Sequence, residues 1–196
     1  WAAREDWFLP SENLIQLIAP DFFGNPTTNN YWGFWNYAEF VSFIGIIPLS
    51  FALLAIIKLP KQATFFFILA ITSLVVALKN PVSQIPYVLK IPLFSTMQPS
   101  RIIFLFDFSL ACLAAFGLDF FLKEKSKIKI LLPSISLVAV LLFLFLASVT
   151  QPSLFPQIIN LNPQQIAIRN LIFPIVTVLV FFLISIFRIL NTPKFI

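Results

Sequence analysis

Long apolar stretches without charge are the feature that most constrains how this chain can fold. Residues 130–149 run for about 20 positions without a charged side chain, which is the length that an α-helix needs to cross a bilayer. Charged residues make up only 11% of the chain, against about 25% in soluble domains, and the mean hydropathy is +0.94. None of the stretches alternates like a barrel strand. The sequence therefore predicts an all-α, polytopic bundle of transmembrane helices.

Five apolar stretches are candidate spans, and lysines mark one side of them. The spans are residues 40–57, 63–78, 102–122, 130–149 and 171–190. The short links at 58–62 and 123–129 hold two and four lysines, whereas the longer segments on the other side hold few basic residues. Because basic residues concentrate in cytoplasmic loops, we expect a protein of the cytoplasmic (inner) membrane with its N-terminus outside and its C-terminus in the cytoplasm.

This topology divides the chain into six parts. The extracytoplasmic parts are 1–39, an aromatic loop with a short interfacial helix; 79–101, a proline-rich loop; and the loop 150–170. The membrane parts are the hairpins 40–78 and 102–149, and the last helix with its cytoplasmic tail at 171–196.

The scarcity of histidine and cysteine excludes several kinds of chemistry. The chain has no histidine and a single cysteine, Cys112, so it holds no Ser-His-Asp triad, no histidine metal site and no internal disulfide. We expect no cofactor, no metal and, without a basic stripe or stacking motif, no nucleic-acid partner. The chain begins at Trp1 and its sole methionine is Met97, so we expect a piece of a longer polypeptide.

The sharpest candidate site is the turn Pro99-Ser100-Arg101 before the third span. Pro99 interrupts any preceding helix, Ser100 is suited to cap the next one, and Arg101 falls in its first turn. Free N–H groups at a helix start and a guanidinium together bind phosphate, so Ser100 and Arg101 are candidate lipid-phosphate ligands. The alternative is that Arg101 only extends to lipid head groups.

Asp107 lies deeper in the same span, roughly 9 Å below Arg101 along the helix axis. A carboxylate at this depth is costly and is a functional candidate by default. Six residues turn a helix by about 240°, so the two side chains do not share a face, and the partner of Asp107 should be Glu39 or a polar loop. The alternative is a structural role for a protonated or hydrogen-bonded aspartate inside the bundle.

Aromatic residues gather before the first span. Tyr31, Trp32 and Trp35, together with Glu39, are a candidate platform for a sugar or acceptor, with rings for C–H surfaces and a carboxylate for hydroxyls. The alternative is an ordinary aromatic belt at the membrane surface. We expect the loops 21–39 and 79–101 and the start of the fifth helix to enclose a cavity.

Small residues are concentrated in the third span. Ala111 and Ala115 lie four positions apart, a spacing that lets helices approach closely in lipid. We therefore expect this span to be the most buried, with the face of Ala111 and Ala115 against neighbouring helices.

Several short motifs carry a family resemblance. They are residues 20–26 (PDFFGNP), 30–33 (NYWG), Glu39 with 44–49 (IGIIPL), 98–101 (QPSR), 109–111 (SLA) and 114–119 (AAFGLD). Across residues 19–122 the chain resembles the YfhO-type bacterial membrane proteins, which are similar to polytopic GT-C glycosyltransferases. The resemblance implies transfer of sugars from polyprenyl-phosphate carriers at the outer face of the membrane. GT-C enzymes usually place the catalytic carboxylate in a loop after their first helix. We expect this chain to lack that loop, so the resemblance carries over no catalytic residue.

The sequence therefore leaves three hypotheses for the function. The leading hypothesis is part of a membrane glycosyltransferase that uses a polyprenyl-phosphate sugar donor and contacts membrane lipid. The first alternative is a transporter or flippase of a lipid-linked saccharide, with Asp107 in its path; a single deep charge disfavours an ion-coupled carrier. The second alternative is a structural membrane subunit.

Overall fold

The computed structural model describes residues 7–124 and 126–191, and this part of the chain is all-α, as predicted. Its β-type pairing consists of two isolated bridges, Leu9 with Leu78 and Ile158 with Leu161. The α-helices are α1 (Tyr37–Phe40), α2 (Ile46–Lys58), α3 (Lys61–Ala77), α4 (Pro81–Val88), α5 (Ile103–Lys123), α6 (Lys127–Thr150) and α7 (Pro163–Asn191). The 3-10 helices are η2 (Ser11–Leu17), η3 (Pro26–Thr28), η4 (Phe94–Thr96), η5 (Pro99–Ile102) and η6 (Pro152–Leu154).

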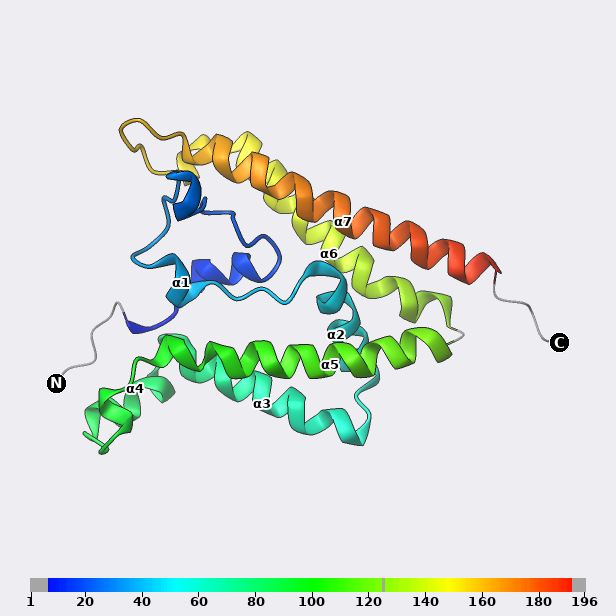
Figure 1. The fold of residues 1–196 in the computed structure, drawn as a ribbon, viewed down its shortest axis with the longest axis horizontal. Coiled ribbons are helices and arrows are strands. Elements are labelled where there is room, and N and C mark those ends of the chain that lie inside the picture. Colours follow the sequence, from blue (N-terminus) through cyan, green and yellow to red (C-terminus); the bar gives the residue numbers. More distant parts are fainter. Residues whose placement is uncertain (1–6, 125, 192–196) are drawn as a thin grey trace.

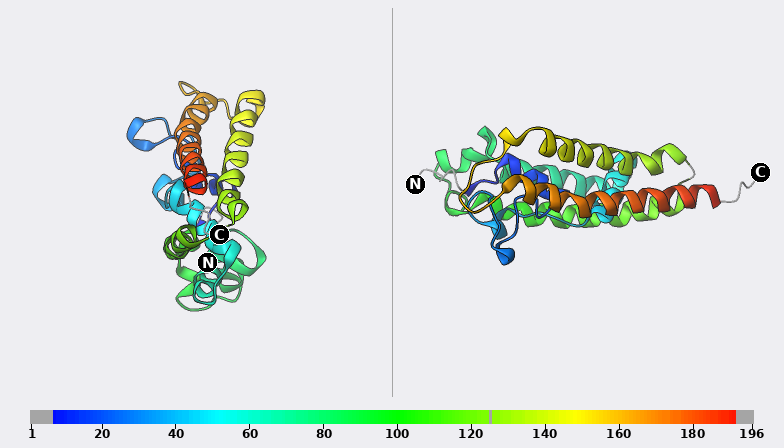
Figure 2. Two further views of the ribbon diagram at one scale, coloured as in Figure 1. Left: turned by 90° about the vertical axis from the view of Figure 1, so that its right-hand side faces the viewer. Right: turned by 90° about the horizontal axis from the view of Figure 1, so that it is seen from above.

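The long helices form two groups that are joined by α2. α3 and α5 pack on α2 and on each other, while α6 and α7 form a second pair that α2 also contacts. Figure 2 shows the two groups on opposite sides of the molecule when it is viewed along its long axis. Toward one end the groups diverge, and the segment 8–45 occupies the space between them (Figure 1).

The membrane-spanning helices are fewer than the five expected. Three helices are long and apolar enough to cross a membrane: Pro99–Lys123, Lys127–Thr150 and Pro163–Leu190. α2 and α3 meet at a bend of 116° and count at most as one further span. The 13 residues of α2 reach only about 20 Å, against about 30 Å of hydrocarbon. The described part of the chain is therefore that of a multi-pass membrane protein with three or four candidate spans.

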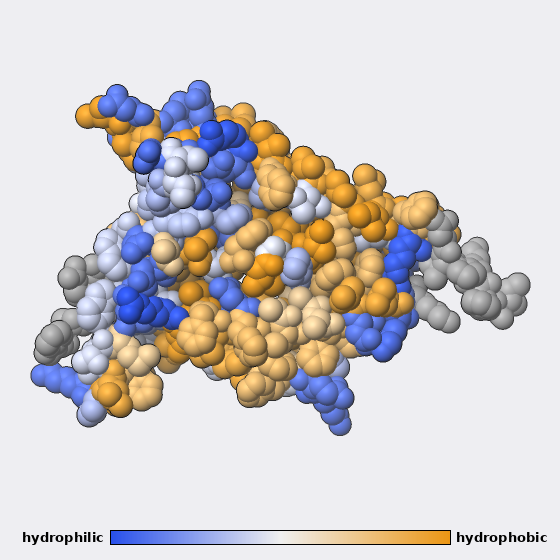
Figure 3. All heavy atoms as spheres, in the orientation of Figure 1, coloured by the Kyte–Doolittle hydropathy of each residue, from blue (hydrophilic) through white to orange (hydrophobic). Residues whose placement is uncertain are grey.

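The loops separate to two opposite ends of the helices. The links α2–α3 and α5–α6 lie together at one end, here called the lysine end. Residues 7–40, 79–102 and 151–162 lie at the other, here called the aromatic end (Figure 1). Figure 3 shows hydrophilic residues at both ends and mainly apolar residues between them. This distribution is the one that a membrane protein presents to water and lipid.

Helix α5 is the most buried of the three long candidate spans, as expected: 39% of its apolar window is buried, against 28% for each of the other two. The face that achieves this is not the expected one. Ala111 and Ala115 are exposed, whereas Leu113, Ala114 and Gly117 are buried. The reason is that α2 crosses α5 at Gly117, where the backbone of Phe51 lies too close for any side chain.

Candidate functional site

Arg101 is held at the aromatic end by a two-point ion pair with Glu39. Its Nε donates to Glu39 Oε2 at 3.1 Å, and its Nη2 donates to Oε1 at 2.9 Å. The Arg101 side chain is 67% exposed and that of Glu39 is 20% exposed. A guanidinium has five N–H donors, so the pair fixes its plane and leaves about three donors facing outward.

The turn η5 sets this position, but Ser100 does not act as expected. Pro99 begins the turn, Gln98 is its N-cap, and α5 has no side-chain cap. Ser100 is completely buried, and its Oγ accepts a hydrogen bond from Gln98 Nε2 at 3.0 Å. The expected capping role of Ser100 is therefore wrong, and the exposed polar group of this turn is the Arg101 guanidinium.

An apolar stripe runs along α5 directly below Arg101. We call it the α5 stripe; its members are Phe104, Phe108, Ala111 and Ala115. All four are exposed, and they follow Arg101 at helix spacings of 3, 7, 10 and 14 residues, which place them on one face. The stripe is about 17 Å long, and its far end at Ala115 lies about 21 Å from Arg101 along the helix. Its first two members after the cation are aromatic, and its last two are small.

Asp107 is hydrogen-bonded to a polar loop, which was one of its two expected partners. The Oγ of Ser42 donates to Asp107 Oδ1, and Ser42 is buried. Ser42 lies in the segment between α1 and α2, residues 41–45, which is not helical; Gly45 at its end has a φ of 96°. Asp107 lies about 12 Å into its span, counted from Pro99. Non-helical backbone at such a depth is tolerated only where protein or a polar cavity surrounds it.

The residues of the expected sugar platform face different surroundings. Trp32 packs edge-on against Phe23 and Phe155, with ring centroids 4.8 and 5.7 Å away. Trp35 is 52% exposed and lies beside Phe40.

Tyr31 turns toward the backbone rather than toward open solvent. Its hydroxyl donates to the carbonyl of Phe34 at 2.9 Å, and its ring packs edge-on against Tyr37. With Glu39 paired to Arg101, the four platform residues are engaged separately, and only Trp35 offers a largely open ring.

Sequence reasoning missed Asp21, which organises the aromatic end. Its Oδ1 accepts from the Tyr37 hydroxyl at 2.9 Å and from Asn25 Nδ2 at 3.1 Å, while its backbone carbonyl accepts from Asn170 of α7 at 2.5 Å. Burial, together with the hydrogen bond and negative charge of Asp21, raises the pKa of Tyr37 to about 12. Because Tyr37 and Glu39 both belong to α1, this short helix connects the hydrogen bonds of Asp21 to the ion pair of Arg101. The separations of 16 and 149 residues left no local signal for it.

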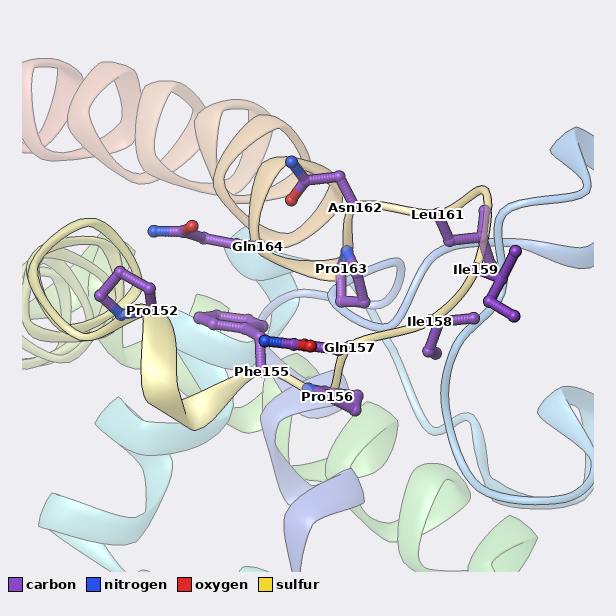
Figure 4. Close-up of a pocket in the computed structure, with 10 residues that line it drawn as sticks. All are labelled: Pro152, Phe155, Pro156, Gln157, Ile158, Ile159, Leu161, Asn162, Pro163 and Gln164. Atoms are coloured by element: carbon purple, nitrogen blue, oxygen red, sulfur yellow. The ribbon is translucent and has the colours of Figure 1, made fainter.

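Among the described residues, two of the cavities lie at the aromatic end. The larger, of about 880 Å³, is lined mainly by apolar residues of 8–13, 23–34 and 75–80, with Pro156. The cavity is not the one expected: of the predicted walls, only parts of 21–39 and Lys79 and Asn80 line it, whereas η2 and the end of α3 replace the rest of 79–101 and the start of α7. The smaller, of about 560 Å³, lies within the loop between α6 and α7 (Figure 4). Across the described residues, no three Cys, Asp or Glu side chains cluster as metal ligands.

Comparison with family models, with curated proteins and with solved structures finds no match for this chain. The resemblance to YfhO-type proteins therefore stays a prediction.

Proposed function

We propose that this chain is the carrier-binding part of a membrane glycosyltransferase-like protein that acts on polyprenyl-phosphate-linked sugars. The observation that supports the proposal most is the exposed guanidinium of Arg101 at the head of the α5 stripe. A polyprenyl phosphate has the matching chemistry, with an anionic head and a long branched apolar tail.

The phosphate would bind the outward N–H groups of Arg101. Arginine suits this role because its planar fork matches phosphate oxygens and stays charged. Glu39 orients the fork but also occupies two of its donors and adds a negative charge beside the ligand. We therefore expect Glu39→Gln to bind phosphate more tightly, because it removes that repulsion and keeps an oxygen acceptor.

The tail would lie along the α5 stripe, where Ala111 and Ala115 leave room beside the helix. The catalytic carboxylate of such an enzyme would come from elsewhere in the polypeptide, in agreement with the family resemblance. Asp21 is fixed but has one carboxylate oxygen, Oδ2, without a partner among the described residues. We assign it no catalytic role.

The aromatic end would face outward from the cytoplasmic membrane, since the lysine-rich links lie at the other end. Single cysteines on a Cys112→Ser background test this orientation in intact cells. An impermeant thiol reagent should label Asn29→Cys and Gln157→Cys from outside, and Ser126→Cys only after permeabilisation. External labelling of Ser126→Cys would show the opposite orientation and would contradict the proposal.

The binding test uses the full-length protein and a fluorescent polyprenyl phosphate in detergent micelles. Arg101→Ala should lose about 1.5–3 kcal/mol of binding, which is a 10- to 150-fold rise in Kd. Arg101→Lys should be impaired less, because it keeps the charge without the fork. Lys90→Ala, an exposed cation at the same end, is the matched control and should change little. Unchanged binding by Arg101→Ala would contradict the proposal.

A second candidate function, a transporter or flippase of a lipid-linked saccharide, is favoured by the contact of Ser42 with Asp107. An intramembrane carboxylate beside unwound backbone is a common arrangement in transporters. Transport across proteoliposomes should then fall in Asp107→Asn and not in Arg101→Lys. If the protein is a glycosyltransferase, the parent protein and both variants should show no transport.

A further inference from the structure

The segment between α3 and η5 exposes an unusual number of large apolar side chains. We call residues 81–97 the α4 lobe; they comprise α4, the following turn and η4. Leu93 is 78% exposed and Val88 is 75% exposed. The other exposed apolar members are Val82, Ile85, Leu89, Ile91, Phe94 and Met97. In Figure 3 the corner of the aromatic end that holds the lobe shows apolar residues beside hydrophilic ones.

The lobe is a fixed structure rather than a loose loop. A capping box between Asn80 and Ser83 starts α4. The Tyr87 hydroxyl donates to the carbonyl of Met97 at 2.6 Å, which ties α4 to the end of the lobe. The ring of Tyr87 also packs edge-on against Phe8 at 5.7 Å. The exposed apolar surface is therefore held in place by contacts on the opposite side.

The polarity of α4 is inverted relative to a helix on a soluble protein. Ser83 and Tyr87 are buried, whereas Val82, Ile85 and Val88 point outward on one helical face. A surface of this kind signals a partner, because contiguous apolar patches on water-exposed surfaces are normally small.

The surroundings of the lobe identify the partner as lipid. The lobe connects α3 to α5, and both helices expose large apolar residues, so its apolar face continues the apolar surface of the candidate spans. Lys90, exposed at the turn after α4, suits the phosphate level of a leaflet. We propose that the α4 lobe is embedded in the leaflet at the aromatic end, with Val88 and Leu93 among the upper acyl chains, as a fixed interfacial anchor. This inference does not depend on the proposed function.

Fluorescence quenching in lipid nanodiscs tests the depth of the lobe. Val88→Cys and Leu93→Cys, on a Cys112→Ser background, carry a small environment-sensitive dye. Phe143→Cys, at a 69% exposed position of α6 about 10 Å before its last residue, Thr150, is the lipid control. Thr28→Cys, in an exposed polar turn at the same end, is the aqueous control.

Quenching by doxyl-labelled lipid at both lobe positions should reach at least half of that at Phe143→Cys. Quenching by aqueous iodide there should be several-fold weaker than at Thr28→Cys. Strong iodide quenching with little lipid quenching would overturn the proposal, because the lobe would then stand in water. Protection from both quenchers would also overturn it, because protein, such as a second copy of the chain, would then cover the lobe.

Discussion

The crossing of α2 and α5 offers a sharp test of the helix packing. A Cβ added at Gly117 would lie 1.7 Å from the carbonyl oxygen of Phe51 and 2.9 Å from its Cα. Because these atoms belong to the backbone of α2, no rotation of a side chain relieves the clash. In Gly117→Ala the helix α2 must therefore retreat by more than about 1 Å.

Two opposing contributions set the size of the effect. Overpacking of a close-packed contact costs about 1–3 kcal/mol, and more where a backbone must move. Replacing glycine by alanine inside a helix contributes about 0.5–1 kcal/mol in the other direction. We expect Gly117→Ala to lower the free energy of unfolding by about 2 kcal/mol, measured by thermal unfolding in detergent.

Ala115→Leu is the matched control on the same helix. It adds more volume than Gly117→Ala, but Ala115 is exposed, so the new side chain meets lipid or detergent. We expect a change within about 0.5 kcal/mol. A larger loss in Ala115→Leu than in Gly117→Ala would show that the face of Ala111 and Ala115 is the packed one, and would refute this account of the bundle.

Two further predictions concern hydrogen bonds near the candidate site. Because the pKa of Tyr37 is raised to about 12, the folded protein holds this proton more tightly than the unfolded chain. The stabilising contribution of the hydrogen bond from Tyr37 to Asp21 is complete below pH 10 and is lost as the pH rises through 12. The difference in unfolding temperature between the parent protein and Tyr37→Phe should therefore shrink over that range. A constant difference would count against this hydrogen bond. Ser42→Ala should cost about 1–3 kcal/mol because it leaves the carboxyl of Asp107 without its donor, whereas Asp107→Asn keeps an acceptor and should cost less; equal losses in detergent unfolding would contradict this.

The sequence was sufficient for the features that depend on composition. Apolar stretches predicted an all-α fold, and the loops do gather at two ends according to their lysine content. The same stretches overestimated the number of spans. Residues 41–45 are as apolar as a helix, so hydropathy could not indicate that the backbone there is non-helical and that α2 begins only at Ile46.

The hydropathy pattern could not predict contacts between residues that are far apart in the sequence. The small residues of α5 predicted a close helix contact, but Ala111 and Ala115 were as plausible a face as Gly117 until the position of Phe51 was known. Arg101 was recognised from its turn, yet its pairing with Glu39 spans 62 residues and has no local signature.

The central claim is that Arg101 binds the phosphate of the carrier. Solid-state NMR dephasing between the phosphorus of the carrier and guanidinium nitrogens measures this contact directly, in bilayers of a phosphorus-free glycolipid that hold the carrier and full-length protein with ¹⁵N-labelled arginine. The account predicts strong dephasing that disappears in Arg101→Lys and persists in Arg169→Lys, which removes another exposed arginine of the aromatic end. Dephasing that persists unchanged in Arg101→Lys would contradict it.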